Sequence, residues 1–315
     1  MLREKKRMVR PAKSFILPII ILFTFNESIA GERPGLAFLN SEMSARGASL
    51  AGTMVAKRGE VHGLFHNPAS LSGLIGVTWS ANYVNHLLDI GGGNLMMAKK
   101  LESGTVGIGL ASMDYGSFNR LDDRGNDLGS DFSASDLIVS LGYSQEITGA
   151  LSIGSNIKWA NSNIDAYSIN AIALDAGFIY YQAERELSIG GGIFNLGKST
   201  AFIDNSDPLP TNFRLGITKL LAHLPLRVNA EGIWLTYGNW KALVSGEIIL
   251  SPNVNLILGL SSIRLDLDTS SLSEDVYSGG NIGLGVTVDK WRIDYALSSF
   301  GGAGLIQRFG LSGNF

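Results

Sequence analysis

The stretch NIGLGVTVDKWRIDYALS, residues 281–298, contains two runs in which apolar and non-apolar side chains alternate. The apolar positions of these runs are Ile282, Leu284, Val286, Val288, Trp291, Ile293, Tyr295 and Leu297. Successive side chains of a β-strand point to opposite faces, so each run predicts a strand with one apolar face. Only Asp289 and Lys290 separate the runs, which predicts a short turn between two strands.

The same pattern of period two recurs through most of the chain. The predicted strands are 76–84, 90–99, 104–111, 134–144, 150–161, 169–182, 187–195, 211–219, 225–236, 241–250, 254–263, 281–289, 290–298 and 306–315. Residues 90–99 show the pattern least clearly. The set amounts to about fourteen strands, and many are close to the 9–11 residues that a tilted transmembrane strand needs.

Charged side chains favour a membrane barrel over a soluble β-sandwich, whose strands also alternate. The charges that fall in mid-strand on the non-apolar face are Lys158, Asp175, Arg214, Arg227, Glu231, Glu247, Arg292 and Asp294. The lumen of a barrel accepts such groups when they are paired or hydrated, whereas a lipid-facing surface does not. We therefore expect the charged face to line a lumen and the apolar face to meet lipid.

Aromatic residues and connection lengths agree with this orientation. The apolar face carries Trp79, Trp159, Trp234, Trp291, Tyr83, Tyr143 and Tyr180, several of them near strand ends, where aromatic girdles meet the membrane interfaces. Short connections near 100–103, 145–149, 183–186, 220–224, 251–253 and 289–290 predict periplasmic turns, and long ones near 114–132, 196–210 and 265–279 predict extracellular loops.

The chain also ends on Phe315, in phase with Phe309 and Leu311, which looks like the C-terminal signature of bacterial outer-membrane barrels. A closed barrel pairs every strand and leaves no edge in lipid. The sequence thus predicts an all-β fold: a transmembrane antiparallel β-barrel of about 14 strands over residues 76–315, in the outer membrane.

Composition excludes several other classes of protein. The 315 residues include 39 glycines and no cysteine, and only 17% are charged. A net charge of −3 offers no basic surface for nucleic acid. Without cysteine there is no disulfide framework, thiolate metal site or cysteine nucleophile. A mean hydropathy of +0.17 is low for a bundle of membrane helices.

Residues 1–30 have the three-part layout of a secretory signal peptide. A basic head precedes an apolar run from Phe15 to Phe25, and the small residues Ser28 and Ala30 stand where a signal peptidase reads, which predicts cleavage after Ala30. The apolar run is shorter than the ~20 residues of a membrane-spanning helix. An uncleaved N-terminal anchor is the alternative.

Residues 31–75 do not alternate, and they contain two motifs that predict a plug folded into the barrel. Residues 44–53 look like a short helix that ends at a turn of small residues, and residues 66–71 fit a turn, because Pro68 fixes its own φ and restrains Asn67. The candidate plug residues are Ser44, Arg46, Gly47, Asn67, Pro68 and Ala69. A flexible periplasmic leader is the alternative.

The sequence predicts no catalytic residue, no metal site and no cofactor. His62 and His66 could share a helix face, but no third ligand stands close in the sequence. No Gly-x-Ser-x-Gly nucleophile elbow is present. Residues 121–127 suggest a calcium loop, but Arg124 occupies a ligand position and Gly125 comes too early for an EF-hand.

Motifs across most of the chain after residue 30 resemble the PorV/PorQ family of outer-membrane proteins of the type IX secretion system, which is distantly related to FadL-type barrels. The matching pieces are Phe38-Leu39-Asn40, Ser44-Ala45-Arg46-Gly47, Asn67-Pro68-Ala69, Tyr83-Val84-Asn85, Tyr115-Gly116-Ser117-Phe118, Gly125-Asn126-Asp127-Leu128-Gly129, Phe132-Ser133-Ala134-Ser135-Asp136, Leu209-Pro210 and residues 220–226. The pieces from Tyr115 onward are most similar to the PorQ branch.

The resemblance implies a non-enzymatic component of a secretion and cell-surface attachment complex. Its implied partners are outer-membrane lipid and lipopolysaccharide, and a PorZ-like surface protein, a sortase or secreted cargo. Aromatic residues dominate interface hot spots, so the candidate partner-binding residues of the long loops are Tyr115, Phe118, Phe132, Phe202 and Tyr277.

The alternative is a FadL-like transporter of hydrophobic small molecules. Such a protein needs an apolar pocket beneath its outer loops. Lumen charges of both signs predict a salt-bridged and largely filled interior, and on that ground the sequence favours the secretion component.

Overall fold

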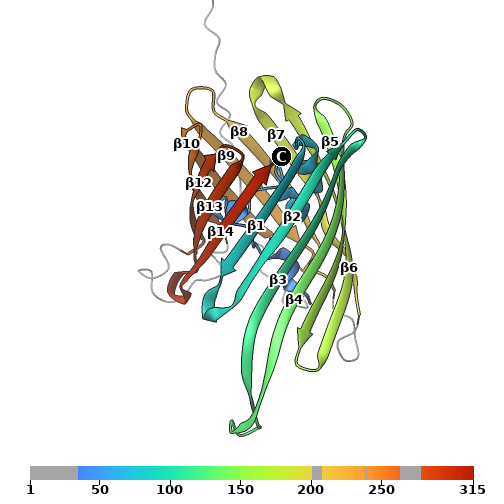
Figure 1. The fold of residues 1–315 in the computed structure, drawn as a ribbon, viewed down its shortest axis with the longest axis vertical. Helices are drawn as coiled ribbons and strands as arrows, with labels where there is room; N and C mark the ends of the chain where they lie inside the picture. Colours follow the sequence, from blue (N-terminus) through green and yellow to red (C-terminus); the bar gives the residue numbers. More distant parts are fainter. Residues whose placement is uncertain (1–34, 201–207, 238–239, 263–277) are drawn as a thin grey trace, which may run out of the picture.

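The computed structural model describes residues 35–200, 208–237, 240–262 and 278–315, which form a closed barrel of 14 antiparallel strands (Figure 1). The predicted signal peptide, residues 1–30, lies outside the described residues. The strands are β1 Val77–Asn85, β2 Gly91–Leu101, β3 Gly104–Leu121, β4 Asp127–Glu146, β5 Leu151–Ile164, β6 Tyr167–Gln182, β7 Leu187–Ser199, β8 Asn212–Leu220, β9 Leu226–Leu235, β10 Trp240–Ser251, β11 Val254–Ser261, β12 Gly280–Val288, β13 Trp291–Ser299 and β14 Leu305–Asn314.

Within the described residues the helical turns are short. They are η1 Ala37–Asn40, α1 Ala45–Ser49, α2 Gly63–His66, η2 Pro68–Gly73, η3 Leu87–Asp89, η4 Ala183–Arg185 and η6 Gly301–Ala303. Over the described part of the chain, none of the helices has both the length and the apolar character to cross a bilayer.

The outward face of the barrel is apolar, as the alternation predicted. Val106, Leu284 and Ile293 are 39%, 43% and 58% exposed, while Ser80 and Asp294 point inward and are buried. Trp79 and Trp291 pack edge to face with ring centroids 5.5 Å apart. A closed barrel with an apolar exterior is the architecture of an outer-membrane protein, because lipid requires every backbone polar group to be paired within the protein.

The ends of the barrel wall meet between β1 and β14. Thr78 pairs with Asn314, and the register continues to Asn85 opposite Gln307. The backbone amide of Phe315 donates to the carbonyl of Val77, so pairing extends to the last residue. This contact removes the free edges that an open sheet would expose to lipid.

The sequence prediction of a long loop at 114–132 is wrong. Strands β3 and β4 continue through this region for 18 and 20 residues in all, beyond the points where β2 and β5 stop pairing with them at Asp114 and Ala134. The result is a two-stranded ribbon, Tyr115–Ser133, that projects from one end of the barrel (Figure 1). Alternation ceases there because no lipid faces the ribbon, although backbone pairing persists.

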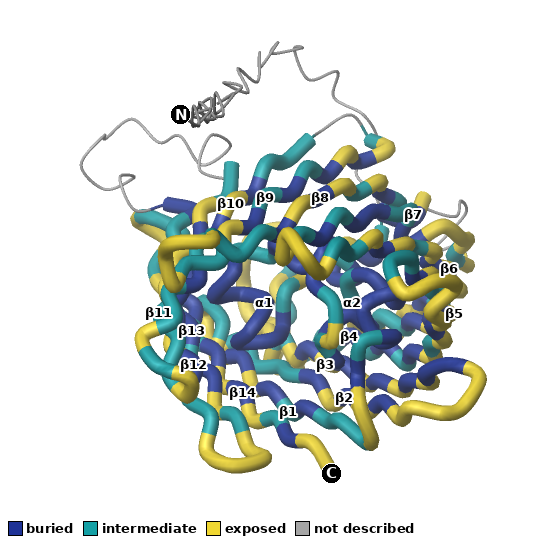
Figure 2. Tube along the Cα trace, turned by 90° about the horizontal axis from the view of Figure 1, so that it is seen from above, coloured by how far each residue is buried: buried dark blue, intermediate teal, exposed yellow. Residues whose placement is uncertain are grey.

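We call the end of the barrel with the ribbon the outer end, since long excursions are extracellular in this class of barrel. Residues 36–76 of the chain fold back inside the barrel, and we call them the plug. Seen along the barrel, α1 and α2 lie within the ring of strands (Figure 2). Helix α1 packs against β12, β13 and β14, and η2 packs against β4, β5 and β6.

Candidate functional site

The first plug motif forms a capped helical turn. Ser44 precedes α1, and its Oγ accepts a hydrogen bond from the backbone amide of Gly47 at 2.9 Å. Ser44 in turn donates its amide and its hydroxyl to Oε1 of Glu42, both at 2.8 Å. A Cβ on Gly47 would lie 2.2 Å from Oε2 of Glu42, so any other residue there would displace that carboxylate. These contacts fix the direction in which α1 leaves the preceding segment.

Arg46 projects from this turn into a buried cluster of charges. Its Nη1 lies 2.6 Å from Oε1 of Glu247 on β10, and its Nη2 lies 3.1 Å from Oε1 of Glu60. Lys57 and Arg227 also reach Glu247, at 3.2 and 3.1 Å. One wall carboxylate therefore binds two cations of the plug and one of the barrel. Such a cluster is satisfied only while the plug stays in place.

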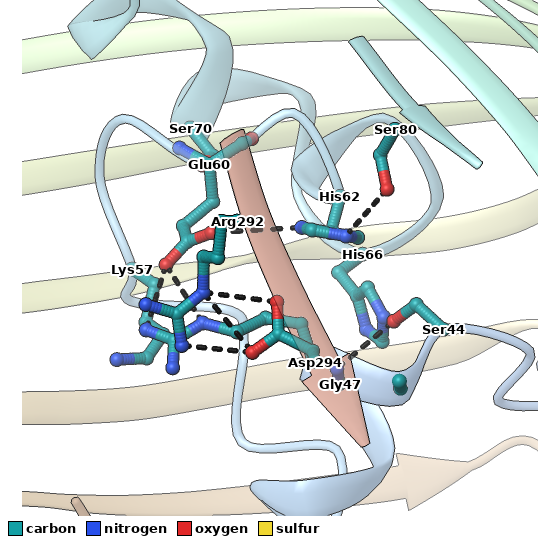
Figure 3. Close-up of polar contacts among 12 residues, drawn as sticks. Ser44, Gly47, Lys57, Glu60, His62, His66, Ser70, Ser80, Arg292 and Asp294 are labelled. Atoms are coloured by element: carbon teal, nitrogen blue, oxygen red, sulfur yellow. Dashed lines mark hydrogen bonds and ion pairs between the residues drawn. The ribbon is translucent and has the colours of Figure 1, made fainter. Parts of the chain in front are cut away.

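Both plug histidines lie beside carboxylates of the plug. His62 lies 3.1 Å from the hydroxyl of Ser80 and 3.5 Å from Glu60 (Figure 3). His66 lies 3.0 Å from Oε2 of Glu42. Burial raises the pKa of the Glu42 carboxyl group, but the charge of His66 and hydrogen bonds from His66 and Ser44 outweigh it and lower the pKa to about 2. No group of three metal-ligating side chains occurs within the described ranges.

The second plug motif lies against the wall at β5 and β6. The side-chain amide of Asn67 donates to the carbonyls of Val55 and Phe178, at 2.6 and 3.1 Å, and its Oδ1 accepts from the amide of Ala69. Pro68 begins η2, where its missing N–H is not needed. Asn67 thus ties the plug to β6.

Two wall glycines admit this motif. A Cβ on Gly154 would lie 2.4 Å from the backbone nitrogen of Ala69, and a Cβ on Gly177 would lie 2.2 Å from Oδ1 of Asn67. At Gly154 the backbone of the wall therefore meets the backbone of the plug, and at Gly177 it meets the side chain of Asn67. The period-two pattern does not single out these glycines, because glycine is frequent throughout the strands.

The wall beside this contact contains an irregularity between β6 and β7. Pairing shifts register between Leu174 and Ala176. Asp175 lies there, its Oδ2 2.7 Å from the ammonium of Lys158 and its Oδ1 2.8 Å from the amide of Asn195. Asn195 adopts a left-handed conformation with φ of 57°, which asparagine tolerates better than most residues. This pair confirms the prediction that lumen charges are salt-bridged.

A cavity of about 400 Å³ lies on the outer side of the plug. Its apolar lining comes mainly from the outer ends of β9 and β10 and from the segment after β13. It includes Ile233, Leu235, Tyr237, Leu243 and Phe300. Its polar lining includes Glu42, His66, His86, Arg214, Lys241 and Arg308. The interior is therefore less completely filled than the sequence predicted, because the plug occupies only part of it.

The candidate partner-binding residues that the structure describes lie on β3 and β4. Phe118 and Phe132 stack across the ribbon with centroids 5.4 Å apart. Tyr115 donates to Asp136 at 2.5 Å, at the base of the ribbon. Phe202 and Tyr277 lie outside the described residues. The first three therefore belong to strands rather than to a loop, and no contact of theirs tests a role in partner binding.

Sequence reasoning missed the plug side of the charge cluster and the cavity. Glu247 was assigned to the lumen, but Lys57 and Glu60 carry no periodicity that predicts their partners. The apolar cavity wall was not distinguished from ordinary lumen filling, because Ile233 and Leu243 are apolar residues on the inward face, in phase with Glu231 and Glu247.

Comparisons with known proteins identify the fold. The sequence matches no family model and no curated protein. Crystal structures of the Pseudomonas putida toluene transporter TodX and the Ralstonia pickettii toluene transporter TbuX align with TM-scores of 0.61 and 0.59, at 14% and 12% identity. Each alignment covers 87% of this chain and 98% of the other. The CymD monoaromatic hydrocarbon channel aligns at 0.57, with 9% identity over 87% of this chain and 97% of its own. The chain therefore has the FadL-like 14-strand barrel fold.

Proposed function

We propose that this protein is an outer-membrane transporter of small molecules with a substantial apolar part. The observation that carries the proposal is the cavity of about 400 Å³ on the outer side of the plug. One side of this cavity is apolar. Pockets of roughly 300–1,000 Å³ lined by apolar side chains and a few polar groups are typical small-molecule sites. The sequence analysis gave this function as its alternative, and the cavity supplies the pocket that the alternative required.

The similar solved structures support the same proposal. TodX and TbuX are toluene transporters and CymD is a monoaromatic hydrocarbon channel. At 14% identity or less they share a fold with this chain, so the function is carried over here as a proposal.

A groove on the lipid-facing surface offers an exit for apolar cargo. It has a volume of about 520 Å³ and is lined by Ile153, Ala176, Gly177, Phe178 and Ile193, among others. On the lumen side, a Cβ on Gly177 would lie 2.2 Å from Oδ1 of Asn67. At this point only the backbone of β6 separates the plug from lipid, next to the register shift between Leu174 and Ala176. A molecule released from the lumen here would enter lipid without crossing water.

The resemblance to the PorV/PorQ family remains a prediction, as do a PorZ-like partner, a sortase and secreted cargo. The two functions make opposite predictions in the native host. Deletion of a type IX component stops export of secreted proteins, whereas deletion of a transporter leaves export intact and slows uptake of apolar molecules.

Uptake by a host that lacks its own channel for apolar molecules tests the proposal. Cells that carry the full-length protein in the outer membrane are expected to accumulate labelled 4-phenylbutan-1-ol and 4-phenylbutyrate faster than cells with an empty vector. Comparable surface expression is checked by heat-modifiable gel migration of the folded barrel. Equal accumulation of both compounds in the two strains would reject the transporter.

A further inference from the structure

A polar pocket lies at the inner end of the barrel, opposite the ribbon, and we call it the inner pocket. Its volume is about 270 Å³, and it is lined by the plug and by the inner ends of β6, β7, β8 and β9. The charged residues of the lining are Lys57, Arg58, Glu60, Glu186 and Arg227. Gly59 and Glu186 of the lining are exposed, so the pocket opens toward the periplasmic side.

The lining of the inner pocket does not suit apolar cargo. None of the described residues that line it is a valine, leucine, isoleucine, methionine or phenylalanine. Its volume also falls below the roughly 300–1,000 Å³ of typical sites for drug-sized molecules. The inner pocket therefore fits a small polar ligand.

The buried charge cluster beside the inner pocket contains more cations than carboxylates. Within the described residues, the carboxylates that lie within 4.0 Å of Arg46, Lys57 and Arg227 are those of Glu60 and Glu247. Lys57 and Arg227 share a single oxygen of Glu247, Oε2, at 3.2 and 3.1 Å. Burial and the charge of Arg46 lower the pKa of the Lys57 ammonium group to about 8, although Glu247 and Glu60 raise it. The ammonium group is therefore less compensated than its burial requires.

The other charges of the lining do not supply the missing negative charge. Arg58 has a partner of its own, Glu146, at 2.6 Å. Glu60 already lies 3.1 Å from Arg46. Glu186 is exposed, so water screens its charge. These contacts leave the excess positive charge of the cluster in place.

Lys57 and Arg227 are the cations of the cluster that line the inner pocket. The side chain of Lys57 belongs to the plug and is 4% exposed, and that of Arg227 belongs to β9 and is 31% exposed. A ligand between the two would therefore touch both the plug and the barrel wall.

We infer that the inner pocket binds a phosphate-type oxyanion from the periplasmic side, and that Lys57 and Arg227 are its binding residues. A phosphate monoester carries about −1.5 to −2 charges at neutral pH and has three acceptor oxygens, so it can contact a plug cation and a wall cation together. Lysine and arginine are both established phosphate-binding side chains in proteins. The bound oxyanion links the plug to the wall. The inference is independent of the proposed function, because it concerns neither the apolar cavity nor its cargo.

The test measures binding of inorganic phosphate, with acetate as the carboxylate probe. Calorimetry uses the full-length protein in phosphatidylcholine nanodiscs at neutral pH and constant ionic strength. Phosphate is expected to bind at least tenfold more tightly than acetate, which is about 1.4 kcal/mol. Arg227→Gln is expected to weaken phosphate binding at least tenfold, and Arg227→Lys to retain part of the affinity.

Lys219→Gln is the matched control. Lys219 follows Thr218 at the inner end of β8 but does not line the inner pocket, so its loss removes one positive charge from the same end of the barrel. This variant is expected to keep the affinity of the wild type. Heat-modifiable migration shows that each variant is folded, and the wild-type comparison of phosphate with acetate still tests the site if Arg227→Gln forms no barrel.

Trypsin cleavage after Lys57 and Arg58 tests the link between plug and wall. A ligand that binds only the docked plug lowers the open population, so phosphate at about ten times its Kd should slow cleavage roughly tenfold. Arg227→Gln should show no such slowing, which excludes an effect of phosphate on trypsin itself.

A second lipid composition distinguishes the two sources of the oxyanion. Phosphatidic acid carries a phosphate monoester headgroup. If nanodiscs that contain it compete with inorganic phosphate for the wild-type protein, the headgroup reaches the pocket from the membrane. If they do not compete, the pocket takes a soluble phosphate.

Three results would overturn the inference. The first is acetate binding as tight as that of phosphate, or no binding of phosphate at all. The second is an equal loss of affinity in the Lys219 and Arg227 variants, which would indicate attraction to the general charge of this end. The third is a cleavage rate that phosphate leaves unchanged in the wild type. Each of these results leaves the proposed transport function standing.

Discussion

Replacing Glu247 by glutamine should release the plug from the barrel wall. Glu247 is fully buried, and it accepts from Arg46, Lys57, Arg227 and Asn255 at distances between 2.6 and 3.2 Å. Glutamine keeps the volume but removes the charge and replaces one acceptor with a donor. Lys57 then has no remaining ion-pair partner among the described residues, whereas Arg46 retains Glu60.

The magnitude follows from the burial of the cluster. Removal of one partner from a buried ion pair costs about 3–5 kcal/mol, because the remaining charge is left uncompensated. If that cost falls on the docked plug, the population of the undocked plug rises by roughly two to four orders of magnitude. Within the barrel wall the substitution affects two side-chain contacts, those of Glu247 with Arg227 and with Asn255, so the stability of the wall itself should change less.

Limited proteolysis measures the undocked population directly. Trypsin cleaves after Lys57 and Arg58, and cleavage tracks the open population when opening and closing are faster than cleavage. The Glu247→Gln barrel, folded in nanodiscs, should be cut at these two positions at least a hundred times faster than the wild type. Its heat-modifiable migration should be unchanged.

Asp165→Asn provides the control, because it removes an exposed ion pair with Arg120 at the outer end of the barrel. Asn tolerates the left-handed backbone of this position. Cleavage after Lys57 should stay at the wild-type rate in this variant. An unchanged rate in Glu247→Gln would refute the reasoning, since the cluster would then not hold the plug.

Three further substitutions test other contacts. Gly177→Val places a Cβ 2.2 Å from Oδ1 of Asn67 and should cost about 1–3 kcal/mol by overpacking, measured as a lower unfolding midpoint in urea. Ile293→Lys on the lipid face should cost about 2–4 kcal/mol if the residue lies at mid-membrane, measured as folding yield into liposomes; no loss would place this face away from lipid. Phe118→Ala should loosen the ribbon by about 0.5–1.5 kcal/mol through loss of the Phe132 stack, measured by hydrogen exchange, and should leave small-molecule uptake unchanged.

The barrel was predictable because lipid imposes a rule that every strand obeys. Leu284 and Ile293 must face outward whatever their neighbours are, so the alternation around them records the fold locally. Alternation did not predict the ribbon, because Phe118 and Phe132 lie outside the region that lipid contacts. Backbone pairing between β3 and β4 there requires no apolar face. Alternation therefore predicts the strand segments within the membrane but not the strand extensions beyond it.

The plug was predictable as a segment but not in its contacts. The Ser44 cap and the Asn67 turn are local, and each satisfies backbone groups within three residues. The pairing of Arg46 with Glu247 spans 201 residues and depends on the register of ten strands, which no local pattern records. Long-range pairs of this kind require the closed barrel before they can be assigned.

Charged residues in the lumen do not by themselves distinguish a secretion component from a transporter. The sequence analysis took lumen charges of both signs as a sign of a filled interior. The predicted ion pairs are present. Those around Glu247 join the plug to the wall, and the cavity lies between them and the outer end of the barrel. A plugged channel needs such pairs to hold its closed state and needs space on the side from which cargo arrives.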